Sequence, residues 1–318
     1  MNLFIEAEWR SPLFLSREQV AATDKAVLLA RTRRGELVRL FPGIYVESEL
    51  WMSLDSDAKY RLRIEAVALA TDHDLVVSHE SAASLWRLPR IEAWPTRVHV
   101  LERAGGAGRV NSKLVRHPVG MPRHSVRLDG IRATDLARTA VDIAATNSFI
   151  EGVTTLDAAL RRTLHPAIGV PRTLLTLEDL AAEVQRIPLR HGQAKASRAI
   201  DFADGRADRP GESMSRVSMS IAGIPAPQLQ VELQGASGRW YAVDFWWPEF
   251  RHIGEFDGRF KYTDPEFLRG RTPQQVLLDE KAREDDLRAG GRGMSRWTWE
   301  VAGSPQRLRQ LLNAAGVR

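Results

Sequence analysis

The last third of the chain alternates between hydrophobic and polar positions in the way that β-strands do. The run Trp240–Trp247 is rich in aromatic and β-branched residues, Pro248 interrupts it, and a second run follows at Arg251–Phe256. These runs predict two neighbouring strands joined by a tight turn. Gln228–Leu233 reads as a strand before them and Ser295–Trp299 as a strand after them. The pattern therefore predicts a small sheet.

Segments with helical spacing surround these strands and fill the region before them. The predicted helices are Leu156–Leu164, Leu174–Arg186, Arg190–Phe202, Gly211–Ala222, Thr272–Ala289 and Pro305–Ala315. The polar segment Asp204–Pro210 contains Gly and Pro, which is typical of a linker. We therefore place a domain boundary near it.

The N-terminal region follows the order of a winged helix-turn-helix in outline. Ser16 and Gln19 form the pattern of a capping box, and Gly35 is suited to end a helix. The predicted elements are helices at Arg17–Ala22 and Thr23–Arg34, followed by strands at Glu36–Leu40 and Gly43–Val46. A small α/β unit with a solvated arginine face is the alternative that this pattern leaves open.

The middle of the chain mixes short strands with helices. The predicted elements are a helix at Lys59–Ala70, strands at Leu75–Val77, Thr96–Leu101, Leu114–His117 and Ser125–Leu128, and helices capped by Ser78 and Thr134. His79, Glu80 and Ser81 are consecutive, and adjacent helical residues point about 100° apart, so we expect capping and packing there rather than a nucleophile–base pair. The histidines without metal-ligand spacing, to which we assign no site, are His73, His99, His117 and His124.

Length favours a multidomain protein, and the mixture of predicted strands and helices favours the α+β class. We predict a winged helix-turn-helix at 1–72, a middle α/β domain at 73–165, a helical connector at 166–205 and an α/β/α domain with a small mixed sheet at 206–318. The absence of cysteine excludes disulfides and thiolate catalysis. With no long apolar run and no secretory signal pattern, we expect a cytoplasmic protein and no membrane partner. The net charge of +5 does not by itself indicate nucleic acid.

Three acidic residues lie in or beside the predicted strands. Asp244 falls in the middle of the first, while Glu255 and Asp257 close the second and share one of its faces. Acids in hydrophobic strands cost free energy unless something compensates them. Clustered carboxylate oxygens suit Mg²⁺ or Mn²⁺, which drive phosphodiester hydrolysis. We favour a metal site; the alternative is that these acids are solvated or pair with nearby arginines.

These residues resemble the core of the PD-(D/E)XK nuclease superfamily, and more closely its very-short-patch-repair-endonuclease-like branch. The matching elements are Asp244, Glu255-Phe256-Asp257-Gly258, Lys261, Lys281-Ala282-Arg283-Glu284 and Arg296-Trp297-Thr298-Trp299. The usual Glu-x-Lys of the superfamily reads Glu-x-Asp here, so the lysine that positions the attacking water is missing from its strand position. Either Lys261 or Lys281 replaces it from elsewhere, or the site is weak or inactive.

The resemblance implies a restriction-endonuclease-like domain at 206–318 and a role for each matching residue. The implied catalytic residues are Asp244, Glu255, Asp257, Lys261 and Glu212, and the implied ligands of Mg²⁺ or Mn²⁺ are Asp244, Glu255 and the Phe256 carbonyl. Glu212 is also explained by its place in a helix's first turn, where the macrodipole favours an acid. Lys281 and Arg283 would face the phosphates of DNA.

The first half of the chain resembles the AbiEi-like antitoxin family of type IV toxin–antitoxin systems over roughly residues 10–165. The matching segments are the wing at Gly35–Tyr45, Ser78–Ala83 and Ala137–Asp142. The family implies DNA binding by the N-terminal module, in which cations grip phosphates while a helix enters the major groove. The cations on the second helix and wing are Lys25, Arg31, Arg33, Arg34 and Arg39.

Two functions from different classes follow, and both involve double-stranded DNA. The first is a metal-dependent DNA endonuclease or nickase directed by its own winged helix, in phage defence or DNA processing. The second is a non-catalytic antitoxin or transcriptional regulator, with a cognate toxin as partner and a degenerate nuclease-like domain used for binding or for a homodimer. The missing lysine favours the second function and the three acids favour the first. We favour the endonuclease.

Overall fold

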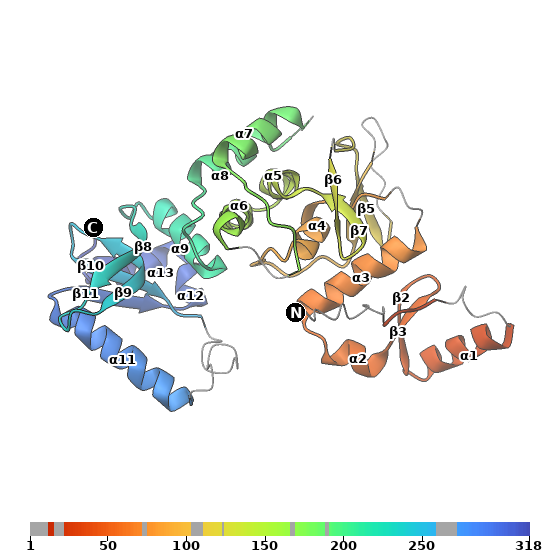
Figure 1. The fold of residues 1–318 in the computed structure, drawn as a ribbon, viewed down its shortest axis with the longest axis horizontal. Coiled ribbons are helices and arrows are strands. Elements are labelled where there is room, and N and C mark those ends of the chain that lie inside the picture. Colours follow the sequence, from red (N-terminus) through yellow and green to blue (C-terminus); the bar gives the residue numbers. More distant parts are fainter. Residues whose placement is uncertain are drawn as a thin grey trace, which may run out of the picture. The chain divides into compact units, whose positions relative to one another are not determined.

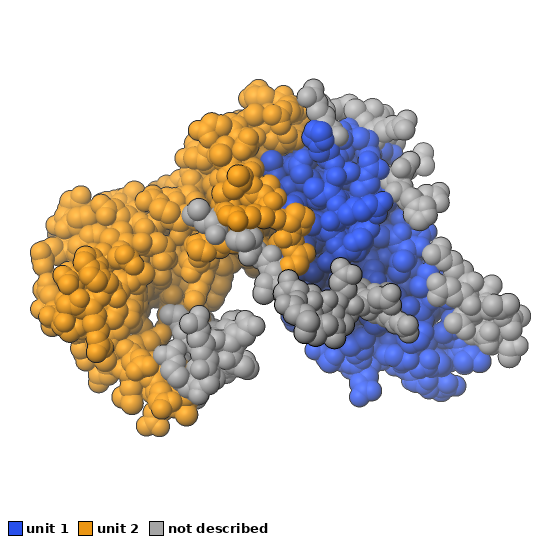
Figure 2. Space-filling model, viewed as in Figure 1, with its two compact units in different colours: residues 1–87, 92–139 blue, residues 88–91, 140–318 orange. Residues whose placement is uncertain are grey.

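The protein is an α+β chain with several small sheets. The computed structural model describes residues 12–15, 22–71, 75–102, 111–122, 124–165, 169–187, 191–258 and 272–318. Internal contacts divide the chain into two compact units, which Figure 2 colours separately. Unit 1 comprises residues 1–87 and 92–139, and unit 2 comprises residues 88–91 and 140–318. This division is coarser than the four predicted domains, and its boundary falls inside the segment 73–165.

Unit 1 begins with a three-stranded antiparallel sheet in the order β1-β3-β2. Its elements are β1 (Phe14–Leu15), α1 (Ala22–Arg33), β2 (Leu37–Phe41), β3 (Ile44–Glu47), α2 (Ser48–Ser53) and α3 (Ser56–Ala70). The hairpin of β2 and β3 therefore forms where the sequence predicts it. The predicted cap at Ser16 and most of the helix predicted from Arg17 lie outside the described residues. Leu15, Val46 and Leu62 belong to one buried cluster that joins the sheet to α3.

A second sheet of unit 1 is assembled around Val77. Parallel strands β4 (Val98–Leu101) and β5 (Leu114–His117) lie on one side of it, and antiparallel strands β6 (Ser125–Leu128) and β7 (Ile131–Thr134) on the other. Val77 forms bridges to Val100 and to Ala133, and thereby connects the two pairs. The short helix α4 (His79–Leu85) follows directly.

Two predicted helix caps differ from the structure. Ser78 precedes α4, but its hydroxyl bonds to the Nδ1 of His79 at 3.0 Å instead of capping the helix. Thr134 ends β7, where its N–H donates to the carbonyl of Val77. The side chain of Asp135 accepts the N–H of Arg138 at 2.8 Å and so caps α5 (Leu136–Thr146). Pairing within the sheet thus removes Thr134 from the capping position.

Unit 2 starts with a group of helices that the sequence largely predicts. They are α6 (Phe149–Leu164), α7 (Leu177–Arg186) and α8 (Gln193–Phe202). The helix α6 begins earlier than the predicted Leu156, because Ser148 accepts the N–H of Glu151 and caps it. Thr176 and Asp179 form a reciprocal capping box at the start of α7.

The sheet of unit 2 has four strands in the order β11-β10-β9-β8. They are β8 (Gln228–Gln234), β9 (Trp240–Trp247), β10 (His252–Phe256) and β11 (Gly293–Trp297). The strands β8, β9 and β10 form an antiparallel meander, whereas β11 runs parallel to β10. The boundaries of β9 match the prediction. The strand β11 begins and ends before the predicted Ser295–Trp299, because Trp299 opens the short helix α12 (Trp299–Ala302).

Helices cover both faces of this sheet (Figure 1). On one face, α9 (Pro210–Ile221), α12 and α13 (Pro305–Ala314) contribute to a core that includes Phe245, Trp247 and Trp297. On the other face, Leu287 of α11 (Pro273–Ala289) packs with Val243 and Ile253. Unit 2 therefore contains a mixed sheet between two helical layers. No helix among the described residues is long and apolar enough to span a membrane.

Candidate functional site

Two acidic side chains from separate elements of unit 2 share one amide donor. Glu212 lies in the first turn of α9 and Asp244 in the middle of β9. The Nε2 of Gln230, on β8, donates to Glu212 Oε2 at 3.0 Å and to Asp244 Oδ1 at 3.3 Å. Glu212 Oε2 also accepts the N–H of Asp208 at 2.9 Å, and Asp244 Oδ2 accepts the N–H of Phe256 at 2.9 Å. Hydrogen bonds thus hold both carboxylates in place.

The environment of this pair disfavours two negative charges. Glu212 is 2% exposed. Burial and the nearby charge of Asp244 raise the pKa of Glu212 to about 8, and the hydrogen bonds from Asp208 and Gln230 oppose that rise. A buried acid beside a second acid keeps its proton because the ionised form loses hydration and meets a like charge. At neutral pH, Glu212 is therefore mainly protonated.

An interruption in the strand pattern places Asp244 near Glu212. Gln230 lies between the paired positions Leu229–Phe245 and Val231–Val243, and has a left-handed φ of +51°. Leu229 and Phe245 pack in the core beside α9, whereas Val231 and Val243 pack in the cluster beneath α11. At Gln230 in β8 and at Asp244 in β9, the buried side chains therefore switch from one face of the sheet to the other. A non-glycine residue with positive φ is strained, and such strain is common at functional sites.

Glu255 lies on the neighbouring strand but binds arginines. Its Oε1 accepts a hydrogen bond from the Nη2 of Arg283 at 2.6 Å, and its Oε2 is 3.2 Å from the Nη2 of Arg296. The same Arg283 nitrogen donates to the carbonyl of Ala242 at 2.6 Å. Glu255 is 5% exposed, so two guanidinium groups compensate a buried carboxylate. This is the arginine pairing considered as the alternative for these acids.

The other residues predicted for this site have different surroundings. The ring of Phe256 packs in the core, and its backbone N–H donates a hydrogen bond to Asp244. Asp257 is partly buried, and its N–H donates to the carbonyl of Trp297 at 2.8 Å. Lys281 is exposed on α11. Lys261 lies outside the described residues. Within the described ranges, no group of three or more His, Asp or Glu side chains is arranged to hold a metal ion.

The cations predicted to bind DNA are partly paired with acids. Arg31 contacts Glu36 at 3.1 Å and Glu47 at 2.8 Å, and Arg34 also contacts Glu36. Arg33 and Arg39 are exposed. Lys25 belongs to α1, but its side chain lies outside the described part of the chain.

Three histidines to which the sequence analysis assigns no ligand or catalytic site form a cluster in unit 1, with His79 buried and the other two partly buried. The rings of His79 and His117 stack with centroids 3.6 Å apart, and His117 Nε2 lies 3.3 Å from His99 Nδ1. His99 Nδ1 is also 2.6 Å from Glu80 Oε2. The cluster joins α4 to β4 and β5, which are separate in sequence, so ligand spacing along the chain could not reveal it. One histidine in each of two predicted strands was the available signal.

Gln230 was left without a role because an amide in a strand carries little chemical signal by itself. Its contribution depends on the two acids that flank it in space.

Comparison with known proteins supplies relatives without a named activity. No known protein family profile matches this chain. The chain is similar to two uncharacterized proteins, from two strains of Mycobacterium tuberculosis. Each is 29% identical over 243 residues, which cover 76% of this chain and 82% of the relative.

Proposed function

We propose that this chain is a metal-dependent DNA endonuclease or nickase whose N-terminal module binds double-stranded DNA. The observation that supports the proposal most is the pairing of Glu212 with Asp244 through Gln230, beside Glu255 on the next strand. These acids come from a helix and two strands of a sheet enclosed by helices. Asp244 and Glu255 also carry the resemblance to the PD-(D/E)XK nucleases, which implies that they share one site with Glu212.

The paired acids are chemically suited to Mg²⁺ or Mn²⁺. Both ions prefer hard oxygen ligands, and a cation would relieve the repulsion that keeps Glu212 protonated. In this proposal Asp244 and Glu212 hold the ion, with Glu255 and the Phe256 carbonyl as further oxygen donors. Bound there, the ion would polarise a phosphate and lower the pKa of a water ligand.

The arginines around Glu255 have a part in the same proposal. Arg283 and Arg296 present planar guanidinium groups to one carboxylate, and this geometry also matches phosphate oxygens. An incoming DNA phosphate would compete for them and leave Glu255 free to bind the ion. Lys261 would stabilise charge that develops on the phosphate, and Asp257 would orient the site.

The DNA-binding part of the proposal rests on unit 1. The helix α1 is followed by the hairpin of β2 and β3, which is the order of a winged helix. Exposed Arg33 and Arg39 belong to these elements and suit contacts with the DNA backbone.

A second function is favoured by one specific observation. Both oxygens of Glu255 contact arginine nitrogens, as expected of a site that has exchanged a metal ion for internal ion pairs. The chain would then be a DNA-binding antitoxin or transcriptional regulator with a degenerate nuclease-like domain.

Cleavage of DNA distinguishes the two functions. Supercoiled plasmid and short duplexes are incubated with the wild type and Mg²⁺ or Mn²⁺, beside Asp244→Ala and the exposed control Asp201→Ala. Metal-dependent nicking by the wild type and the control, lost in Asp244→Ala, is the expected result. A wild type that shifts duplex DNA in a gel but cuts none would support the regulator. Nicking that survives in Asp244→Ala would rule out the proposed site.

A further inference from the structure

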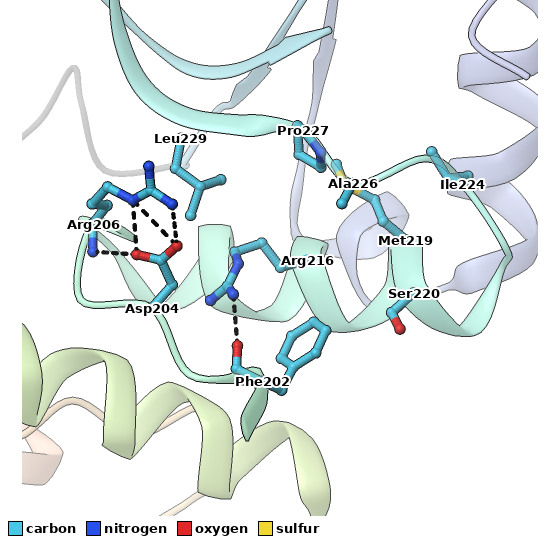
Figure 3. Close-up of a pocket in the computed structure, with 10 residues that line it drawn as sticks. All are labelled: Phe202, Asp204, Arg206, Arg216, Met219, Ser220, Ile224, Ala226, Pro227 and Leu229. Atoms are coloured by element: carbon cyan, nitrogen blue, oxygen red, sulfur yellow. Dashed lines mark hydrogen bonds and ion pairs between the residues drawn. The ribbon is translucent and has the colours of Figure 1, made fainter. Parts of the chain in front are cut away.

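Unit 2 contains a cavity beside the paired acids that the proposed chemistry does not use. Its volume is about 380 Å³, which falls in the range of small-molecule sites. Figure 3 shows the residues that line it, which come from the end of α8, the loop after it, α9, the loop between α9 and β8, and β8 itself. The lining residues are Phe202, Asp204, Arg206, Arg216, Met219, Ser220, Ile224, Ala226, Pro227 and Leu229.

One wall of the cavity is formed by a guanidinium group and an aromatic ring that lie close together. The guanidinium of Arg216 lies 4.8 Å from the ring centroid of Phe202, and its Nη2 donates to the Phe202 carbonyl at 2.7 Å. The Nη1 of Arg216 binds Asp157 Oδ2 at 2.7 Å. These bonds hold Arg216 in one orientation. Met219, Ile224 and Leu229 are buried and supply apolar surface.

A polar pair completes the lining. Arg206 donates to both carboxylate oxygens of Asp204, with the shortest contact at 2.7 Å. The two arginines of the lining are thus matched by Asp204 and by Asp157 behind the wall. A phosphate would find no excess positive charge here. The combination of a planar guanidinium, an aromatic ring, apolar surface and a polar pair suits a neutral, flat ligand with hydrogen-bonding edges.

Three segments of the chain connect the lining of the cavity to the proposed catalytic acids. Arg216 follows Glu212 by one turn of α9, and Leu229 precedes Gln230 on β8. The loop that carries Arg206 continues to Asp208, whose N–H donates to Glu212. The same helix, strand and loop thus carry both the lining of the cavity and the groups that hold the acids.

We infer that this cavity binds a nucleobase extruded from duplex DNA next to the phosphate that is cut. This inference rests on the proposed function for its source of ligand, whereas the recognition of a base depends on the cavity alone. Extruded bases are commonly held by stacking and by hydrogen bonds to their edges. Asp204 would accept from an exocyclic amino group and Arg206 would donate to a ring nitrogen or carbonyl.

Binding of adenosine to the full chain tests the cavity without any cleavage step. Saturation-transfer NMR and titration compare wild type, Ala226→Trp and Ala314→Trp. Ala226 is an exposed residue of the cavity lining, and Ala314 is exposed on α13 and does not belong to the lining. Adenosine is expected to bind wild type and Ala314→Trp, and to bind Ala226→Trp more weakly by about tenfold or more, because a filled cavity removes the stacking contact. Deoxyribose 5-phosphate is expected to give no signal.

Absence of adenosine binding, equal binding by Ala226→Trp, or equal binding of deoxyribose 5-phosphate would overturn the inference. Displacement distinguishes the sources of the base. A duplex with one bulged adenine is expected to displace adenosine more strongly than the fully paired duplex. Equal displacement by the two duplexes, or none, would overturn the assignment to DNA.

The variant Asp244→Ala is expected to bind adenosine as wild type does. If wild type binds adenosine but cuts no DNA, the nuclease proposal fails while the base-binding cavity stands.

Discussion

At the scale of single residues, buried ionisable groups determine how this protein responds to pH. Glu212 keeps its proton because burial and Asp244 raise its pKa to about 8. An unfolded glutamate titrates near its ordinary value, so the folded state binds the proton more tightly. The resulting stabilisation is present in full below the ordinary glutamate pKa and is lost as the pH rises through about 8.

We predict that the unfolding free energy of Glu212→Gln depends less on pH than that of the wild type. The amide is a neutral isostere of the protonated acid, so the variant has no carboxyl group to ionise. Between about pH 5 and 8, wild type should lose on the order of 1–3 kcal/mol more unfolding free energy than the variant. Urea unfolding at both pH values measures the difference. The exposed Glu232→Gln on β8 serves as the control, and a slope for Glu212→Gln equal to that of wild type would contradict the assignment.

The histidine cluster of unit 1 gives the stability of the protein the opposite dependence on pH. Burial, followed by the neighbouring His99, lowers the pKa of His117 to about 4. His79 stacks on its ring, and Glu80 and Arg138 also act on it. Because the unfolded chain takes up this proton first, stability is complete above the ordinary histidine pKa and falls as the pH drops toward about 4.

We therefore expect His117→Gln to lose less unfolding free energy between pH 7 and 5 than wild type, by on the order of 1 kcal/mol. Chemical denaturation at the two pH values is the measurement. His124→Gln, which changes an exposed histidine, should keep the wild-type dependence. If both variants behave alike, the cluster is not the source of acid sensitivity.

At the scale of elements, close contact between α9 and β10 positions the acids. A Cβ added at Gly211 would lie 2.1 Å from ring atoms of Phe256. Gly211 precedes Glu212 and the Phe256 N–H binds Asp244, so this contact joins the two elements that carry the site. Only glycine allows α9 to approach the strand so closely.

Gly211→Ala should therefore destabilise the protein by about 1–3 kcal/mol, because the added methyl group forces the core to rearrange. Thermal or urea unfolding of purified protein measures this change. Gly258→Ala is the matched control, since its added Cβ would lie at an ordinary 3.7 Å from the same ring. Equal midpoints for the two variants would show that α9 and β10 adjust freely.

At the scale of the whole molecule, the chain crosses between its two compact units more than once. Residues 88–91 belong to unit 2, although the segments on either side belong to unit 1. Arg90 Nε lies 3.3 Å from Glu151 Oε1, with side chains only 7% and 1% exposed. The N–H of Ile91 donates to the other oxygen of Glu151 at 3.2 Å. This buried ion pair attaches the crossing segment to α6.

Removing the arginine of this buried ion pair should destabilise the protein. We predict that Arg90→Leu lowers the unfolding free energy by about 3–5 kcal/mol, because the buried carboxylate of Glu151 loses a partner. Arg186→Leu breaks the more exposed pair with Glu183 and should cost less than about 1 kcal/mol. Urea denaturation monitored by circular dichroism compares the two. A small effect of Arg90→Leu would show that other contacts attach residues 88–91.

Local sequence patterns predicted most elements of both units. Aromatic and β-branched residues indicated Trp240–Trp247, and β9 has those boundaries. Thr176 and the acids after it indicated the start of α7. The misplaced cap at Thr134 has a tertiary cause, because the residue is used in the sheet and Asp135 takes over. Asp244 was selected as an acid in a hydrophobic strand and Glu212 by resemblance, whereas Gln230 and the histidine cluster were assigned no site.

The sequence by itself determined what depends on neighbours along the chain: the strands, most helices, the absence of cysteine and the acids in hydrophobic surroundings. Tertiary structure alone decided which charges meet. Asp244 meets Glu212 across Gln230, whereas Glu255 meets Arg283 and Arg296. The physical reason is that the pKa and the ligand capacity of a buried acid depend on charges and donors within a few ångströms, and here those groups come from distant parts of the chain.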